Sequence, residues 1–336
     1  MLYQQLASSA PKGASTPSFG TIKRAFVCPP FVSDLATRNF LGLPEIEGHP
    51  DVTILSVPYE LTTSYGQGTT YGPKATITAS SQVELYDPLL PEDLPCGFKI
   101  KTAESWSGEG NTLREQLDDI EKYLNSHQNN SFPIILGGEH GMLPAIVNVI
   151  GKKVELKDLT IVQIDAHADL RNELDGDSDS HACAARRCLD LGVGKILQIG
   201  IRSFSREESE FTTKDKRVEA WLARDILNPC GGEIAWRKWL NTLSEISGPV
   251  WLTLDVDGLD SVYVPTTGTP VPGGLAYWQV VETIETIAAA PNVDWLGADV
   301  NEIVPDQNNH VTEFTAAMLV TKIIAAHLAN KLEEQA

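Results

Sequence analysis

Apolar residues occur along the chain in short, nearly continuous runs, and longer segments of mixed polarity separate these runs. Such runs are typical of parallel β-strands that helices cover on both faces, because both faces of the strand are then buried. Gly, Asp, Asn or Arg follows most of the runs and marks where each strand ends. The predicted strands span residues 52–57, 132–136, 159–164, 196–201, 250–254 and 293–300.

The segments between these runs have the apolar spacing of helices. Over residues 113–126, Leu117, Ile120 and Leu124 recur at intervals of three or four, which places them on one helix face. Further helices are expected over residues 232–243, 277–290 and 312–332. Strands that alternate with helices predict an α/β fold with a central, mainly parallel sheet flanked by helices. No fixed-period repeat or long low-complexity linker divides the chain, so we expect a single domain.

Composition and charge exclude several classes of protein. The 336 residues include 26 Lys and Arg against 45 Asp and Glu, which gives a formal net charge of −19. A hydrophobic fraction of 42% is ordinary for a globular protein and too high for a disordered one. The acidity argues against a nucleic-acid partner, which requires a basic face. It can steer cationic ligands, although many proteins are acidic for solubility alone.

The ends of the chain show no membrane or secretion signal. The apolar stretch of residues 316–329 contains Lys322 and His327 and is too short to span a bilayer, so we expect no membrane partner. Residues 1–17 are rich in Ser, Ala, Gly and Pro and lack the apolar core of a signal peptide. We therefore expect a flexible tail over residues 1–22 and one domain over residues 23–336.

The cysteines favour a reducing compartment. They are odd in number, widely spaced and without a Cys-x-x-Cys pair, which fits free thiols in a cytoplasmic protein better than a disulfide framework. The five are Cys28, Cys96, Cys183, Cys188 and Cys230.

Polar residues of catalytic type lie just past four of the apolar runs. They are His140, Asp165, Asp255 and Glu302. In open α/β sheets the carboxyl ends of the strands form the edge where ligands bind, so these side chains are expected to lie close together.

The segment Asp165-Ala166-His167-Ala168-Asp169 offers three possible metal ligands within five residues. Alternate residues of an extended segment point the same way, although this segment can already be leaving its strand. The simpler interpretation is a turn at the strand end with solvated carboxylates.

The segment Asp255-Val256-Asp257-Gly258-Leu259-Asp260 follows another apolar run. Ionised carboxylates at the end of a buried strand are costly unless a cation compensates them, and a divalent ion would do so. A helix cap or a turn is the simpler role, and it suits Asp260 better than Asp255 or Asp257.

The segment Gly137-Gly138-Glu139-His140-Gly141 combines a flexible turn with a candidate imidazole ligand. A single His after a strand is more often structural, but the position of His140 at the same sheet edge favours a ligand. A phosphate-binding loop would need Gly-Lys-Ser/Thr, which is absent here.

The pooled ligands comprise two imidazoles and four carboxylates, a set that suits Mn²⁺, with Ni²⁺, Fe²⁺ or Zn²⁺ as alternatives. Four carboxylates are too many for one small cation and indicate two ions. Two ions held about 3.5–4 Å apart lower the pKa of a shared water, which predicts hydrolysis. The predicted ligands are His140, Asp165, His167, Asp169, Asp255 and Asp257.

These three segments, in this order and spacing, resemble the signatures of the ureohydrolase family. Its members include arginase, agmatinase, guanidinobutyrase, formiminoglutamase and guanidine hydrolase. The resemblance extends from about residue 50 to about residue 330 and includes residues 57–73, residues 268–274 and Glu302, which Pro305 and Asp306 follow. It implies the family's three-layer α/β/α fold, a catalytic domain and a homotrimer or homohexamer.

The resemblance also implies roles for individual residues. One ion would be held by His140, Asp165, Asp169 and Asp255, and the other by Asp165, His167, Asp255 and Asp257. Activated water would attack a guanidinium carbon, and Glu302 would hold the guanidinium as a bidentate carboxylate. His181 matches a histidine that shuttles protons, although a surface His that caps a helix is the simpler role. Thr269 matches a threonine beside the ions, where it binds substrate or only shapes the turn. The expected catalytic residues are thus His181, Glu302 and Asp169.

The substrate implied by the resemblance is agmatine, cleaved to putrescine and urea in polyamine metabolism. Residues 169–173 and 180–182 resemble agmatinases, and the Thr/Ser/Asn-rich stretch that binds the amino-acid end of arginine in arginases is missing. Four positions depart from the family pattern, and none is a predicted ligand. They are Gly141 for Ser, Gln67 for Arg, Asn172 for Asp and Ser261 for Pro.

Three other functions remain open. Guanidine or guanidinobutyrate is a possible substrate, because the departures at Gln67 and Gly141 can change the pocket. A catalytically silent, regulatory relative is a second alternative, although all the predicted ligands are present. A two-metal phosphatase is the third, since Arg171, Arg186, Arg187 and Arg202 lie near the motifs.

Overall fold

The computed structural model describes residues 39–44, 46–108, 110 and 112–335. The tail predicted over residues 1–22 lies outside the described residues, as does Cys28. The other four cysteines are free thiols.

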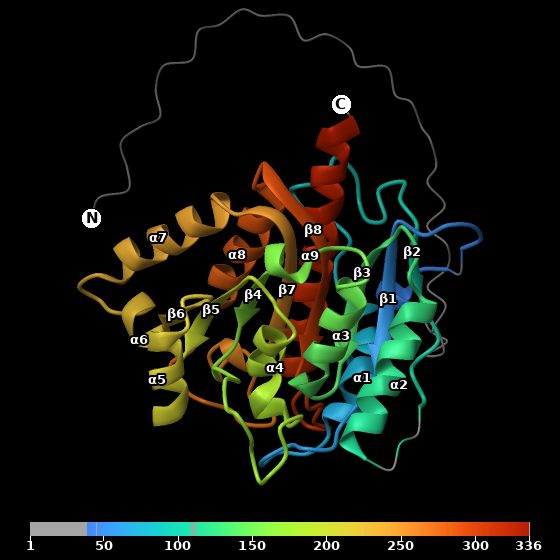
Figure 1. Cartoon of the computed structure of the whole chain (residues 1–336). Coiled ribbons are helices and arrows are strands. Elements are labelled where there is room, and N and C mark those ends of the chain that lie inside the picture. Colours follow the sequence, from blue (N-terminus) through green and yellow to red (C-terminus); the bar gives the residue numbers. More distant parts are fainter. Residues whose placement is uncertain (1–38, 45, 109, 111, 336) are drawn as a thin grey trace, which may run out of the picture. The chain divides into compact units, whose positions relative to one another are not determined.

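Eight strands form one sheet in the order β2-β1-β3-β8-β7-β4-β5-β6, and every neighbouring pair is parallel (Figure 1). The strands are β1 (Val52–Val57), β2 (Ile100–Thr102), β3 (Phe132–Gly137), β4 (Thr160–Ile164), β5 (Lys195–Ile201), β6 (Val218–Leu222), β7 (Ser247–Asp255) and β8 (Asn292–Asn301). The predicted α/β fold with a central parallel sheet is therefore confirmed.

Helices connect the strands and cover both faces of the sheet. They are α1 (Gly72–Ser80), α2 (Leu113–Ser126), α3 (Leu143–Ile150), α4 (Ala184–Asp190), α5 (Arg206–Lys214), α6 (Ala223–Ile226), α7 (Gly232–Ser244), α8 (Tyr277–Ala289) and α9 (Val311–Gln335). Among the short 3₁₀ turns, η3 (His140–Met142) and η5 (His181–Cys183) lead directly into α3 and α4, whereas η6 (Val256–Gly258) follows β7.

The alternation of side chains along the strands divides the core into two layers. In β1, Ile54 belongs to the core layer that includes residues of α7, α8 and α9, whereas Leu55 belongs to the layer on the other face, which includes residues of α2, α3 and α4. In β3, Ile134 and Ile135 divide in the same way. Both layers are apolar, which explains why the central strands have nearly continuous apolar sequences.

The predicted strands and helices are all present, with ends within three residues of those observed. The pattern missed β2 and β6, which are the two edge strands of the sheet. The edge strand β2 has only three residues, and β6 is mostly half-buried, so neither has an apolar run. The shorter helices α1, α3, α4, α5 and α6 were also not predicted.

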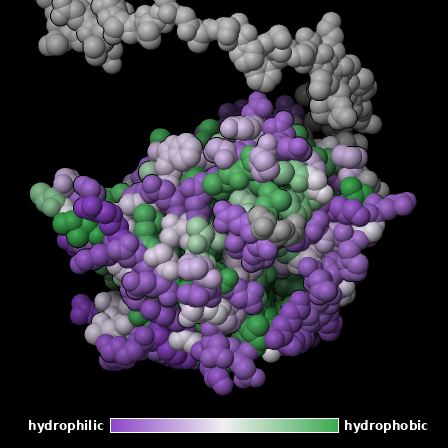
Figure 2. Space-filling model, turned by 90° about the horizontal axis from the view of Figure 1, so that it is seen from above, coloured by the Kyte–Doolittle hydropathy of each residue, from purple (hydrophilic) through white to green (hydrophobic). Residues whose placement is uncertain are grey.

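Helix α9 corrects one expectation. Its segment Val311–Glu334 has 24 residues, and its most apolar 18-residue window has a mean hydropathy of 1.3, so by length and composition it could cross a bilayer. The expectation that this stretch is too short was therefore wrong. However, 78% of its most apolar window is buried inside the protein, where it packs on the sheet between α1 and α8. The apolar side chains of α9 therefore belong to the protein core. The molecular face seen in Figure 2 carries mostly hydrophilic side chains.

The strand order brings the predicted site residues together. Strands β3, β8, β7 and β4 are consecutive neighbours in the sheet, although β3 and β8 are far apart in the sequence, as are β7 and β4. Their carboxyl ends carry His140, Glu302, Asp255 and Asp165, respectively. The loops that follow these strands gather at the lower end of the sheet in Figure 1. Neighbouring strands lie about 4.8 Å apart, so four strand ends span only about 15 Å.

Candidate metal centre

His140 begins η3, directly after β3, and its side chain is buried. Its Nε2 lies 2.8 Å from the hydroxyl of Thr253, and that hydroxyl donates to Asp299 Oδ2 at 2.6 Å. Because the hydroxyl gives its proton to a carboxylate, it accepts one from Nε2. The imidazole is therefore fixed with its proton on Nε2 and a free lone pair on Nδ1.

The Nδ1 atom of His140 is buried and has no hydrogen-bond partner among the described residues. It faces Asp165 Oδ2 and Asp169 Oδ2, each at 3.2 Å, and Asp255 Oδ2 at 3.7 Å. An unpaired imidazole nitrogen among three carboxylate oxygens is a donor set for a divalent cation.

A second group lies beside the first. His167 Nδ1 lies 3.1 Å from Asp257 Oδ2 and 3.6 Å from Asp165 Oδ1. The groups His140–Asp165–Asp169 and Asp165–His167–Asp257 each place ligand atoms within 4.8 Å of one another. Asp165 belongs to both groups and turns one oxygen to each, so it is placed to bridge two ions.

Backbone amides hold the acidic side chains in place. The amide of His167 donates to Asp165 Oδ1 at 2.6 Å, and the amide of Asp257 donates to Asp255 Oδ1 at 2.8 Å. Asp169 has a φ of 53°, a left-handed conformation that is uncommon outside glycine and often found at functional sites. The chain has thus left the β-strand before Asp169, and a turn, not strand alternation, brings its carboxylate to His140.

The pKa values of the carboxyl groups show that the cluster lacks positive charge. Burial and the charges of Asp257 and Asp165 raise the pKa of Asp255 well above its usual range. Burial and the charge of Asp165 raise the pKa of Asp169 to about 6. Burial also acts to raise the pKa of Asp165, but the adjacent imidazoles of His140 and His167 lower it below its usual range. Divalent cations would supply the missing positive charge.

The imidazoles show the complementary effect. Burial acts to lower the pKa of His167, but hydrogen bonds to Asp165 and Asp257 outweigh it and raise this pKa to about 11. Burial likewise acts to lower the pKa of His140, but the negative charges of the adjacent Asp165 and Asp169 outweigh it and raise this pKa. Two cations bound here would take the place of these protons, because metal ions and protons compete for the same lone pairs.

Glu302 directly follows β8, on the other side of His140. Its Oε1 accepts a 2.8 Å hydrogen bond from the backbone amide of His140, and its φ of 63° is left-handed. Burial and the charge of Glu139 raise its pKa well above the usual range. Gly268 leaves room beside the other oxygen, since a Cβ there would lie 3.0 Å from Glu302 Oε2. A buried carboxylate with an open oxygen is suited to a cationic guanidinium.

A cavity of about 260 Å³ joins these groups, and His140, His167, Asp169, Asp255, Thr269 and Glu302 line it. His181 also lines it, and its side chain is only 18% exposed, so it is not the surface helix cap of the simpler interpretation. Burial lowers the pKa of His181, which keeps its ring neutral near pH 7. Thr269 lies with its hydroxyl 3.4 Å from Asp257 Oδ2.

The arginines near the motifs do not form a phosphate site. Arg171 lines the cavity, with its Nε 3.9 Å from the buried Glu208 carboxylate. Arg202 donates to backbone carbonyl oxygens, including that of Asp257 at 2.7 Å. Arg186 stacks on an aromatic ring, and Arg187 forms an ion pair within α4 at 2.9 Å. Only one of the four thus faces the cavity, which disfavours the phosphatase alternative.

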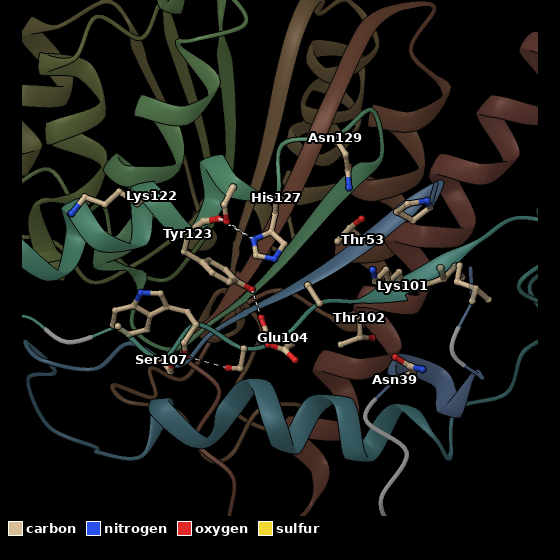
Figure 3. A pocket seen from close by; sticks show the side chains of 18 of the residues that line it. Asn39, Thr53, Lys101, Thr102, Glu104, Ser107, Lys122, Tyr123, His127 and Asn129 are labelled. Atoms are coloured by element: carbon tan, nitrogen blue, oxygen red, sulfur yellow. Dashed lines mark hydrogen bonds between the residues drawn. The ribbon is translucent and has the colours of Figure 1, made fainter. Parts of the chain in front are cut away.

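A larger cavity of about 890 Å³ lies beside the edge strand β2 and α2. Lys101, Thr102, Tyr123 and His127 are among the residues that line it (Figure 3). Of the residues predicted from the motifs, none lines this cavity, so its size does not make it the functional site.

Sequence reasoning missed the residues that support the ligands. They include Thr253 and Asp299 behind His140, and Gln163, whose Nε2 donates to Asp165 Oδ2 at 2.8 Å. Gln163 and Thr253 are polar residues inside apolar strands, and that interruption was the available signal. Thr62, which contacts His181 from the loop after β1, had no such signal.

A sequence profile of the arginase family matches residues 50–326, which include every residue of the centre described above. The chain belongs to the arginase family. This family typically binds a two-metal centre, and the two His/Asp groups described here lie where such a centre would form. The arginase-family chain is thus a hydrolase of the ureohydrolase type.

Individual relatives of this arginase-family chain are also ureohydrolases by name. It is similar to the agmatinase of Pyrococcus horikoshii, with 33% identity over 294 residues, 85% of this chain and 96% of that protein. It is also similar to the N(1)-aminopropylagmatine ureohydrolase of Synechocystis, with 31% identity over 301 residues, 85% of this chain and 93% of that protein. The crystal structure of agmatine ureohydrolase of Thermoplasma volcanium matches with a TM-score of 0.71 and 29% identity, over 84% of this chain and 92% of that one.

Proposed function

We propose that this arginase-family chain is a dinuclear metallohydrolase that cleaves agmatine to putrescine and urea. One ion would be held by His140, Asp165, Asp169 and Asp255, and the other by Asp165, His167, Asp255 and Asp257. Mn²⁺ is the proposed ion and Ni²⁺ the alternative, because carboxylate-rich sites without sulfur suit these metals.

One observation carries the proposal above the others. The buried, unpaired Nδ1 of His140 faces three carboxylate oxygens, and Glu302 and His181 face the same cavity. A purely structural histidine would pair both ring nitrogens, since an unsatisfied buried polar atom costs about 1–3 kcal/mol. All the predicted ligands are present, which disfavours a silent relative.

The chain's own residues would position the substrate and move protons. When bound, the ions lower the pKa of a water so that it is a nucleophile at neutral pH. Glu302 would hold the planar guanidinium with its carbon facing the carboxylate cluster. A C–O bond forms at this carbon and the C–N bond to the tail breaks, so the products are urea and an amine. His181 would carry a proton to the departing nitrogen.

The substrate assignment has a different basis. A cationic guanidinium suits Glu302 and the acidic protein, and two of the relatives described above act on agmatine or aminopropylagmatine by name. Aminopropylagmatine is therefore a second candidate. A third, 4-guanidinobutyrate, is favoured by Arg171, because an arginine in the cavity wall would attract a carboxylate tail.

Urea release decides among these substrates. We would strip the protein of metal, reload it separately with Mn²⁺ and Ni²⁺, and assay agmatine, aminopropylagmatine, 4-guanidinobutyrate, guanidine and arginine. Agmatine is expected to have the highest kcat/KM, and Asp255→Ala should abolish activity. Arg171→Gln serves as a matched variant, because it should weaken the binding of a substrate with a carboxylate tail and should not weaken the binding of agmatine, whose ammonium tail the arginine repels.

Each outcome has a distinct meaning. Highest activity on another guanidino compound would replace agmatine and retain the chemistry. Bound metal without urea from any of the compounds would contradict the proposal and favour a silent relative. We further propose that the protein is a homotrimer or homohexamer, which size-exclusion chromatography with light scattering would test. We also propose that it is cytoplasmic.

A further inference from the structure

Thr62 lies in the loop that follows β1 and contacts two groups that come from distant parts of the sequence. Its hydroxyl donates to Glu139 Oε1 in a short hydrogen bond. The hydroxyl oxygen of Thr62 also lies 3.0 Å from His181 Nδ1, and it accepts a 3.0 Å hydrogen bond from the backbone amide of His181. Thr62 thus links the glycine-rich turn after β3 to the candidate proton carrier.

The direction of these hydrogen bonds follows from the partners available. Glu139 is fully buried, and its Oε2 already accepts the amides of Leu61 at 2.7 Å and Thr62 at 2.6 Å. A carboxylate that accepts hydrogen bonds is an acceptor only, so the Thr62 hydroxyl must give it its single proton. The hydroxyl can then only accept from the ring of His181, and Nδ1 of His181 must carry the proton.

This arrangement leaves Nε2 of His181 as the basic nitrogen. Ser64 Oγ lies 3.2 Å from Nε2, and both Ser64 and His181 line the cavity, so Nε2 is on the cavity side. Ser180 Oγ is a weaker partner for Nδ1, at 3.4 Å. The neutral ring therefore presents a lone pair to the cavity and keeps its proton on the protein side.

We propose that Thr62 is a positioning residue that fixes the tautomer of His181, with the proton on Nδ1 and the lone pair on Nε2 facing the substrate. The effect on catalysis rests on the function proposed above, whereas the tautomer does not. Without Thr62, Nδ1 loses its nearest acceptor and keeps only the weaker contact with Ser180 Oγ at 3.4 Å, so the ring is free to rotate or to place its proton on Nε2.

Gly141 lies against the same contact between Glu139 and His181. A Cβ at residue 141 would lie 3.2 Å from Glu139 Oε1 and 3.3 Å from both the amide nitrogen and the Cα of His181. These distances are close to the limit for real contacts, so a larger side chain would push Glu139 and His181 apart. The glycine therefore permits the close approach that Thr62 requires.

The test compares Thr62→Val, which keeps the shape and removes the hydroxyl, with Thr62→Ser, which keeps the hydroxyl. Thr78→Val is the control, because that exposed hydroxyl bonds only to its own helix, at Lys74 O. We would measure metal content, kcat and KM with Mn²⁺ for the substrate that gives most urea. We would also record the ¹⁵N NMR spectrum of the histidine rings in the full-length protein at about pH 8, where the two neutral tautomers are resolved. This sample would be loaded with diamagnetic Zn²⁺, because paramagnetic Mn²⁺ would broaden the signals. His181→Gln identifies the His181 signals.

In the wild type, the His181 spectrum should show the Nδ1–H tautomer, and in Thr62→Val it should show a mixture or the Nε2–H form. Thr62→Val should lose about 10- to 100-fold in kcat with KM and metal content unchanged, a part of the 10²–10⁴-fold that proton transfer contributes. Thr62→Ser should restore most of the rate, which a purely structural role would not require.

The Nε2–H tautomer in the wild type would overturn the proposal. Wild-type kinetics in a folded Thr62→Val, or equal losses in Thr62→Val and Thr62→Ser, would overturn it too. Should the wild type release no urea from any guanidino compound, the proposed function fails, and the spectra alone then decide the role of Thr62.

Discussion

Asp255 and Asp260 lie in one loop, yet their carboxylates have opposite surroundings. Burial and neighbouring negative charges raise the pKa of Asp255. Asp260 is less buried, and its oxygens accept the backbone amides of Val262, Gly273 and Gly274, which lower its pKa. In the absence of a cation, the ionised Asp255 carboxylate therefore destabilises the folded protein, whereas the Asp260 carboxylate stabilises it.

This contrast predicts opposite effects for one chemical change. In metal-free protein, Asp255→Asn should raise the melting temperature, because it removes a buried charge and keeps the oxygen that accepts the amide of Asp257. Asp260→Asn should lower stability by about 1 kcal/mol, since it weakens charge-assisted hydrogen bonds. Adding Mn²⁺ should stabilise the wild type strongly and Asp255→Asn little.

Differential scanning calorimetry with and without Mn²⁺ measures all of these effects. Asp260→Asn is the matched control, because it should keep the stabilisation by Mn²⁺. Lower stability of metal-free Asp255→Asn than of the metal-free wild type would show that Asp255 is a structural acceptor and not a ligand held ready for an ion.

At the scale of elements, a buried ion cluster ties α9 to its neighbours. Lys322 of α9 is 8% exposed, and its Nζ lies 3.0 Å from Asp87 Oδ2 and 2.5 Å from Glu285 Oε1 of α8. The Asp87 side chain is only 13% exposed, whereas that of Glu285 is 37% exposed. Lys322→Met should lower the free energy of unfolding by about 2 kcal/mol, because it leaves the mostly buried Asp87 carboxylate without its cation. Urea unfolding measures this loss.

Lys331 on the same helix provides the control. It pairs with Asp51 at 2.7 Å, but both side chains are partly exposed, at 32% and 29%. Lys331→Met should therefore cost at most about 1 kcal/mol. Equal losses in the two variants would mean that burial does not strengthen the Lys322 cluster.

The sequence predicts central elements better than peripheral ones, for a physical reason. Strands such as β4 and β7 are buried on both faces, so their apolar runs directly reflect their position in the sheet. The edge strand β6 is half-buried and α5 is mostly exposed, so no apolar pattern is required of them. The ends of α9 were predicted to within three residues. Only residues 316–329 were taken as its apolar stretch, however, which underestimates the segment that is long and apolar enough to cross a bilayer.

The same reasoning applies to the site. The clustering of candidate ligands such as Asp165 and Asp255 could be predicted because they lie at the ends of strands that finish at one sheet edge. Supporting residues such as Asp299 and Thr62 could not, because their roles depend on which loop lies against which strand end. Only the strand order, in which β8 inserts between β3 and β7, brings these residues together.

At the scale of the whole molecule, the raised pKa values of His167 and Asp169 predict how the stability of the metal-free protein depends on pH. The pKa of His167 is about 11 in the folded protein against an ordinary 6.5, so its stabilising effect is complete below pH 6.5 and is lost as the pH rises towards 11. The pKa of Asp169 is about 6 against an ordinary 3.8, so its protonated form also stabilises at low pH, and this is lost between pH 3.8 and 6. The lowered pKa values of His181, His327 and Asp165 act in the opposite direction, but only below about pH 6.5. Above about pH 6.5, metal-free protein should therefore lose stability as the pH rises.

Metal binding reverses this trend, because ions compete with protons for the imidazole and carboxylate ligands and bind more tightly as the pH rises. Between about pH 6 and pH 9, the melting temperature of metal-free protein should fall while the stabilisation by Mn²⁺ grows. Salt at about 0.15 M limits the contribution of the net charge of −19. His167→Asn should flatten the decline of the metal-free protein at the alkaline end. A metal-free melting temperature that rises over this range would contradict the assignment, because it would mean that His167 holds no extra proton beside Asp165 and Asp257.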